Sequence, residues 1–230
     1  MKITFESEWY IVIDDLLDKE VFDKLHLQID SLAYVPLVYG DDKVYKSNCG
    51  DIYKNDKKYW YDKPEESPKY IQLFMEAIHG AGKTEAKNVI LGEFTNFGMF
   101  VTAYRQGAEL SWHIDGYDFK GAYSYYAHKE WGHSWGGNLM LADPKTTYNV
   151  FTDPGPDIKI EGMYHWAGRT VHWFDLKKES EEVQNPGIGT YVAPLPNRLV
   201  ISKCRVVHKV EKITPSAGDN HRISMTGFFE

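Results

Sequence analysis

The spacing of apolar residues changes near residue 88, from a helical period to a period of two. Before that point the sequence predicts one strand at Trp9–Ile13, two helices, and between the helices a loop at 36–66 that allows one further strand. The first helix is expected to begin after Asp18, which is suited to the N-cap, and the second at the pair Ser67–Pro68, because proline favours the first helical turn. Gly80 and Gly82 are expected to end the second helix. The apolar stripes of the two helices are Val21, Phe22, Leu25, Ile29 and Leu32, and Ile71, Phe74, Met75 and Ile78.

The second part of the chain consists of short strand-like runs separated by turn residues. These runs are 88–94, 99–104, 110–115, 123–128, 138–142, 198–202, 205–210 and 223–229. Short strands with turns between them favour a barrel or a jelly roll over βαβ units. Residues 143–195 break this pattern, because they are rich in proline, glycine and charge. We therefore expect an all-β core with two helices beside it and a late insertion.

Composition narrows the class of protein. The 230 residues are 43% hydrophobic, which is enough for a packed core, and the net charge of −7 argues against non-specific nucleic-acid binding. Cys49 and Cys204 are the two cysteines, so a disulfide framework is excluded and a reducing compartment fits. No apolar run approaches the roughly 20 residues of a membrane span, and the N-terminus lacks the features of a signal peptide. We expect a cytoplasmic protein with no nucleic-acid or membrane partner. The sequence does not reveal the oligomeric state.

The first chemical signal is the run Ser111–Gly116, which contains a His-x-Asp motif. Residues i and i+2 of a strand point to the same side, so His113 and Asp115 project together. An imidazole and a carboxylate are two of the three ligands of the facial triad that holds non-haem Fe(II). His208, in a later strand-like run, is the candidate for the third ligand. Taken alone, the motif favours a structural histidine that is hydrogen-bonded to a nearby aspartate.

A second signal is the pair Arg222 and Ser224 near the C-terminus, again at i and i+2. A guanidinium fork beside a hydroxyl is suited to a carboxylate, because the fork contacts both oxygens. The alternative for Arg222 is a surface salt bridge, which would contribute little. The pair therefore favours an acidic small-molecule ligand.

Four ordered blocks resemble one family. Residues 104–115 are similar to the Tyr…Gly…His-x-Asp segment of prolyl 4-hydroxylase-like Fe(II)/2-oxoglutarate dioxygenases. Residues 125–139 resemble that family's Tyr-Tyr-Leu-Asn-x-x-Trp…Gly-Gly-x-Leu stretch, and residues 197–210 its Arg-Leu…His-x-Val ending. Arg222 falls where the family binds its co-substrate. The resemblance covers roughly residues 88–142 and 195–230.

The resemblance implies a mainly β protein with a double-stranded β-helix (a cupin-like jelly roll) and supporting N-terminal helices. It implies one domain over 1–230, with helical support at 1–87 and a core at 88–230 that is interrupted by 143–195. Its cofactors would be Fe(II), 2-oxoglutarate and O2, with ascorbate as an optional stimulant. The site residues that it implies are His113, Asp115 and His208 for the metal and catalysis, and Arg222, Ser224, Tyr126 and Tyr104 for 2-oxoglutarate.

The implied activity is hydroxylation of an unactivated C–H bond, with release of succinate and CO2. The substrate is expected to be an amino acid, a peptidyl residue such as proline, or a small metabolite. Asp115 favours hydroxylation over halogenation, because halogenases of the superfamily carry Gly or Ala at that position. Phe228 stands where the superfamily's nucleic-acid demethylases carry a second Arg, which disfavours demethylation. The alternative is a non-catalytic jelly-roll protein that binds a metal or ligand.

Two departures and two segments remain open. Arg222 follows His208 by 222 − 208 = 14 positions, more than in prolyl hydroxylases, and the pair Ala127–His128 replaces the family's Leu-Asn. Both differences weaken the case for a peptidyl proline substrate. The histidines of the insertion, His165 and His172, could serve a substrate lid, a second metal site or an aromatic mini-core. The lysine-rich segment 54–63 fits a solvated loop or a substrate-gating loop.

Overall fold

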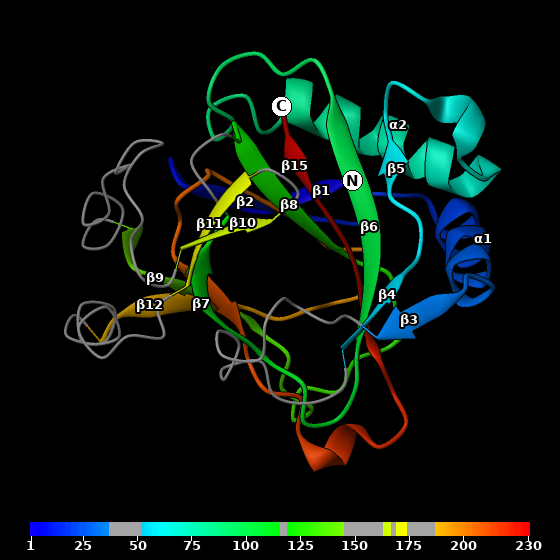
Figure 1. Cartoon of the computed structure of the whole chain (residues 1–230), viewed down its shortest axis with the longest axis vertical. Helices are drawn as coiled ribbons and strands as arrows, with labels where there is room; N and C mark the ends of the chain where they lie inside the picture. The colour runs from blue at the N-terminus through cyan, green and yellow to red at the C-terminus, as the bar shows by residue number, and fades with distance from the viewer. Residues whose placement is uncertain (37–51, 116–118, 145–162, 167–168, 174–186) are drawn as a thin grey trace.

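Two antiparallel sheets face each other, and two helices cover the outer side of the larger sheet (Figure 1). This computed structural model describes residues 1–36, 52–115, 119–144, 163–166, 169–173 and 187–230. The arrangement is mostly β and is that of a jelly roll, as the sequence predicts.

The larger sheet has the strand order β1-β2-β13-β8-β15-β6-β4-β3, and β5 also pairs with β6. Its central strands, β6, β8 and β15, carry most of the residues described below. The strands of this sheet are β1 (Lys2–Glu6), β2 (Tyr10–Asp14), β3 (Tyr34–Pro36), β4 (Ile52–Asn55), β5 (Tyr59–Trp60), β6 (Phe97–Tyr104), β8 (Gly121–Tyr126), β13 (Leu199–Ser202) and β15 (Arg222–Phe229).

The smaller sheet has the order β10-β11-β7-β14-β9-β12. Two of its neighbouring strands, β7 and β14, hold the candidate metal ligands. The strands of this sheet are β7 (Leu110–Ile114), β9 (Leu139–Ala142), β10 (Met163–Trp166), β11 (Arg169–Trp173), β12 (Gly189–Val192) and β14 (His208–Val210).

The helices are α1 (Lys19–Asp30) and α2 (Lys69–Lys83), accompanied by the short 3₁₀ helices η1 (Pro64–Glu66) and η2 (Pro215–Ala217). The Asp18 carboxylate accepts a hydrogen bond of 2.9 Å from the backbone N–H of Val21, which confirms the predicted N-cap. The apolar sides of both helices pack against one face of the larger sheet in the main hydrophobic core. The opposite face of that sheet is therefore left to face the smaller sheet.

The predicted end of the second helix is wrong. α2 continues through Gly80 and Gly82 and ends at Lys83. A Cβ atom at position 82 would lie 2.9 Å from the Phe94 ring and 3.1 Å from the Phe229 ring. Gly82 therefore allows the helix to approach the aromatic core closely, which is a packing role and not a stop signal.

The predicted strand at 88–94 is also wrong. This segment turns back on the end of α2, since the N–H groups of Val89 and Ile90 both donate to the carbonyl of Ala86 at 2.9 Å. Val89, Ile90 and Phe94 are buried while Leu91 is exposed, and an apolar run of this length does not distinguish a buried turn from a strand. β6 consequently begins at Phe97, within the predicted connecting turn.

Other strands are shorter than predicted or were not predicted. The run at 205–210 forms a strand only over His208–Val210, because Arg205 has a positive φ of 68°. The strands that the sequence analysis did not predict are β1, β3, β4, β5, β10, β11 and β12. The side chains of His165 and His172 in the insertion lie outside the described part of the chain, as do residues 37–51. Among the described residues, no helix has both the length and the apolar character needed to cross a bilayer.

Candidate active site

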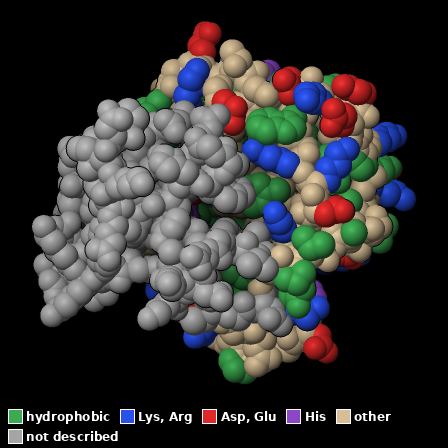
Figure 2. Space-filling model, viewed as in Figure 1, with side chains coloured by type: hydrophobic (Ala, Val, Ile, Leu, Met, Phe, Trp, Pro, Cys, Tyr) green, Lys and Arg blue, Asp and Glu red, His purple; other side chains and the backbone are tan. Residues whose placement is uncertain are grey.

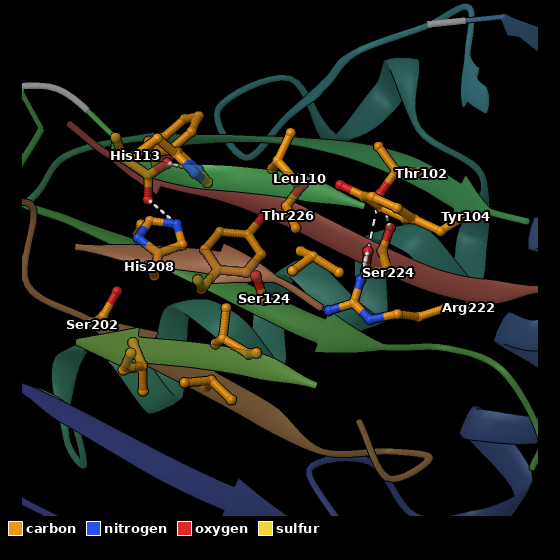
Figure 3. Close-up of a pocket in the computed structure, with 18 of the residues that line it drawn as sticks. Thr102, Tyr104, Leu110, His113, Ser124, Ser202, His208, Arg222, Ser224 and Thr226 are labelled. Carbon is orange, nitrogen blue, oxygen red and sulfur yellow. Dashed lines mark hydrogen bonds and ion pairs between the residues drawn. The ribbon is translucent and has the colours of Figure 1, made fainter. Parts of the chain in front are cut away.

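A cavity of about 110 Å³ lies between the two sheets (Figure 3). The larger sheet lines it with alternate residues of its central strands, as the two-residue period of a strand requires. The lining residues from the two longest strands are Phe100, Thr102 and Tyr104 of β6, and Arg222, Ser224, Thr226 and Phe228 of β15. The smaller sheet contributes both predicted histidine ligands and four aliphatic side chains.

The three predicted metal ligands meet in this cavity. The ligand atoms of His113, Asp115 and His208 all lie within 4.8 Å of one another. His113 of β7 stands directly opposite His208 of β14 in the strand register, and Asp115 follows the end of β7. The predicted common orientation of His113 and Asp115 is therefore present.

A register shift helps to aim the β7 side chains. His113 pairs with His208 and Leu110 pairs with Val210, so three steps along β7 match two steps along β14. Such a bulge lets both Leu110 and His113 face the cavity although they are an odd number of residues apart. Ile114 points the other way and packs in a separate small cluster with Trp112.

The protonation of the cluster suits a divalent cation. Burial raises the pKa of the Asp115 carboxyl, but the neighbouring His208 and His113 outweigh it and hold the pKa below its usual value. Burial lowers the pKa of His208, which favours the neutral imidazole that metals bind. The Nδ1 of His208 lies 2.7 Å from the Val206 carbonyl, a contact that directs the opposite nitrogen, Nε2, toward Asp115 at 3.4 Å.

The predicted carboxylate-binding pair lies in the same cavity, away from the histidines (Figure 3). Arg222 is only 2% exposed, and its Nε donates to the Gly137 carbonyl at 2.7 Å while its NH1 donates to the Ser224 hydroxyl at 3.2 Å. The Ser224 hydroxyl also lies 2.9 Å from that of Thr102. No carboxylate pairs with Arg222 among the described residues. A buried guanidinium without a carboxylate partner is suited to bind an anionic ligand.

Both predicted tyrosines flank this guanidinium. The carbon centre of the guanidinium lies 5.2 Å from the Tyr104 ring centroid and 4.9 Å from the Tyr126 ring centroid. Tyr104 lines the cavity. The buried hydroxyl of Tyr126 makes no hydrogen bond of good geometry within the described part of the chain. An unsatisfied buried hydroxyl beside an unpaired cation fits a ligand with carboxylate oxygens.

Several cavity residues were missed by the sequence analysis. Ser124, Ser202 and Thr226 bring hydroxyl groups to the cavity (Figure 3). Phe100 also lines it. The two-residue period counted from Arg222 and Ser224 could have identified Thr226. Ser124 and Ser202 could not be found in this way, because their facing depends on which strands are neighbours.

Comparison with known proteins identifies the family. The sequence profile of the 2OG-Fe(II) oxygenase superfamily matches residues 99–230. No curated protein matches the chain significantly.

Solved structures share the fold. A prolyl-4-hydroxylase from Pseudomonas putida superposes with a TM-score of 0.60 at 15% identity, covering 96% of this chain and 91% of the other. A prolyl hydroxylase from Trichoplax adhaerens, in complex with a peptide fragment of the hypoxia inducible factor oxygen degradation domain, gives 0.56 at 14% identity, covering 97% and 84%. HygX from Streptomyces hygroscopicus, with nickel and 2-oxoglutarate bound, gives 0.56 at 11% identity, covering 96% and 82%.

The family match includes every residue of the metal cluster and of the Arg222 pair. The jelly-roll fold is that of 2-oxoglutarate-dependent oxygenases, and the three residues of the cluster could hold a metal ion. The chain therefore belongs to the 2OG-Fe(II) oxygenase superfamily and is an Fe(II)- and 2-oxoglutarate-dependent dioxygenase.

Proposed function

We propose that His113, Asp115 and His208 hold the Fe(II) of this oxygenase. The observation that carries the proposal is the convergence of two imidazoles and one carboxylate within 4.8 Å, on a cavity that also contains a buried arginine. Two histidines and one carboxylate are the ligand set of non-haem Fe(II) oxygenases. When bound, Fe(II) with 2-oxoglutarate and O2 supplies oxidation of a C–H bond, coupled to release of succinate and CO2.

The remaining predicted residues are proposed to hold 2-oxoglutarate. Arg222 and Ser224 would bind its distal carboxylate, because the guanidinium is buried and its NH1 already contacts the serine hydroxyl. The Tyr126 hydroxyl is suited to donate to the same carboxylate, and Tyr104 to cover it from the opposite side. The aliphatic wall of the cavity excludes water, which strengthens these charged contacts.

We propose hydroxylation of an amino acid, a peptidyl residue or a small metabolite as the reaction. Asp115 supports hydroxylation over halogenation, since it supplies the carboxylate ligand. Phe228 lines the cavity at the position where a nucleic-acid demethylase would carry a second Arg. We further propose a cytoplasmic enzyme with one domain, in which 1–87 support the core and 143–195 form the substrate-specific insertion.

The test is formation of succinate by purified protein with Fe(II), 2-oxoglutarate, O2 and ascorbate. Slow release without a primary substrate is expected, and stimulation by free amino acids or proline-containing peptides would reveal the substrate class. Mass spectrometry should then show the gain of one oxygen atom. Tight Fe(II) binding with no succinate under any condition would favour the non-catalytic alternative.

A further inference from the structure

One row of residues crosses five strands of the larger sheet at one end of the cavity. Consecutive members of the row stand directly opposite each other in the strand pairs: Ser202, Ala122, Phe228, Gly98 and Trp60. Residues that oppose each other in an antiparallel pair project to the same face. Because Ser202, Ala122 and Phe228 line the cavity, Gly98 and Trp60 lie on the cavity face as well.

The missing side chain at Gly98 makes room for Lys58. A Cβ atom at position 98 would lie 2.3 Å from Cε of Lys58 and 3.2 Å from the ring of Trp60. The Lys58 ammonium also lies 3.8 Å from the Trp60 ring centroid. Lys58 is half-buried and thus extends across Gly98, beside Trp60 and next to Phe228.

The adjacent lysine has a different setting. Lys57 is exposed, and its ammonium donates to the Glu66 carbonyl at 2.6 Å and lies 5.4 Å from the Tyr59 ring. Tyr59 pairs with Met99, and both belong to the core on the helix side of the sheet. Lys57 and Lys58 therefore place equal charges on opposite faces of one sheet edge.

Lys58 lies beside the cavity, next to a wall with few charges. Among the described residues that line the cavity, Arg222 and Asp115 carry formal charge, and both are assigned above. Figure 2 shows Lys and Arg side chains beside a recessed hydrophobic surface near the centre of this view.

We propose that Lys58 is a specificity-determining residue that binds a carboxylate of the primary substrate, while Trp60 and Phe228 pack against the apolar part of that substrate. This inference rests on the proposed function. In that proposal Arg222 and Ser224 bind 2-oxoglutarate, so a carboxylate of the primary substrate needs a different cation. The substrate class is accordingly a carboxylate-bearing amino acid or short acidic peptide.

The experiment compares acid and amide partners of equal shape as stimulators of succinate release. The probes are free Asp and Asn, free Glu and Gln, and capped tripeptides in which Glu or Gln precedes Pro-Gly. The wild-type enzyme should prefer the acidic member of at least one pair by about tenfold in the concentration for half-maximal stimulation, as expected for a hydrogen bond to a charged group. K58Q should abolish this preference, and K57Q should retain it.

G98A provides a second variant that keeps both lysines. Its new methyl group would displace the Lys58 side chain, so the acid preference should fall as it does in K58Q. Equal stimulation by acids and amides, retention of the preference in K58Q, or stimulation by no probe would each overturn the inference. If only the Lys58 inference is wrong, wild type and K57Q still release succinate at the basal rate. If the proposed function is wrong, that basal release is absent.

Discussion

The buried hydroxyl of Tyr126, beside Arg222, makes no hydrogen bond of good geometry in the described part of the chain, while its neighbour Tyr125 donates to Asn197 at 2.8 Å. Both side chains are fully buried. A buried hydroxyl without a partner costs stability, whereas a satisfied one contributes about 1 kcal/mol. Tyr125 and Tyr126 of β8 are therefore expected to differ, Tyr125 serving the fold and Tyr126 the proposed co-substrate site.

This difference yields a paired prediction. Y126F should leave the free energy of unfolding unchanged or slightly raised, and it should raise the KM for 2-oxoglutarate. Y125F should lower the free energy of unfolding by about 1 kcal/mol and leave that KM unchanged. Chemical denaturation and succinate-release kinetics measure the two effects, and an unchanged KM in Y126F would remove Tyr126 from the co-substrate site.

Arg222 allows a second prediction at this scale. Because the guanidinium is proposed to bind 2-oxoglutarate in ground and transition states alike, R222A should mainly raise the KM for 2-oxoglutarate, by about 10–100-fold. The matched control is R105A, since Arg105 is exposed and stacks on Tyr53. If the KM of R222A for 2-oxoglutarate equalled that of the wild type, the assignment of Arg222 to the co-substrate site would be wrong.

At the scale of elements, two glycines in α2 show how one residue type serves two purposes. Nothing lies within 4 Å of a Cβ atom at Gly80, whereas at Gly82 such an atom would contact Phe94 and Phe229. G80A should raise the free energy of unfolding by about 0.5–1 kcal/mol through helix propensity. G82A should lower it by about 1–3 kcal/mol through overpacking. Equal effects of the two substitutions in urea unfolding would refute this interpretation of the helix end.

The same elements show what the sequence could predict. Helical spacing located α1 and α2, and the two-residue period located the central strands and placed His113 and Asp115 on one face. The segment 88–94 was mistaken for a strand because its apolar run resembles one. Its buried residue Phe94 in fact packs beside the end of α2 and pairs with no strand. The strand neighbours that bring Ser124 and Ser202 to the cavity face are tertiary information without a local signal.

At the scale of the whole molecule, His128 connects three distant parts of the chain. It follows β8, its Nε2 lies 2.7 Å from the Pro194 carbonyl, and its Nδ1 lies 3.3 Å from the Ile223 carbonyl. Burial lowers the pKa of His128 to about 4, because it outweighs the Pro194 carbonyl, which favours the protonated ring, and the charge on Arg222 adds to the lowering. The folded protein therefore keeps this imidazole neutral, and protonation of the ring favours the unfolded chain.

The pH dependence follows from this shift. An unfolded histidine has a pKa of about 6.5, so folding is unaffected above that value and loses stability as the pH falls toward 4. The loss attributable to His128 should reach about 3 kcal/mol at pH 4. H128Q should lose less stability over this interval, as measured by urea unfolding at a series of pH values. Parallel curves for wild type and H128Q would show that His128 does not titrate in this way.

The central claim is that the cluster on β7 and β14 binds the iron on which 2-oxoglutarate turnover depends. The most direct measurement is succinate formed per protein chain with Fe(II), 2-oxoglutarate and O2, in wild type and in H113A and H208A. We predict several turnovers for wild type, and neither stoichiometric Fe(II) binding nor succinate for the two variants. Succinate formation by H113A or H208A at the wild-type rate would contradict the account, as would a wild-type protein that binds Fe(II) and forms none.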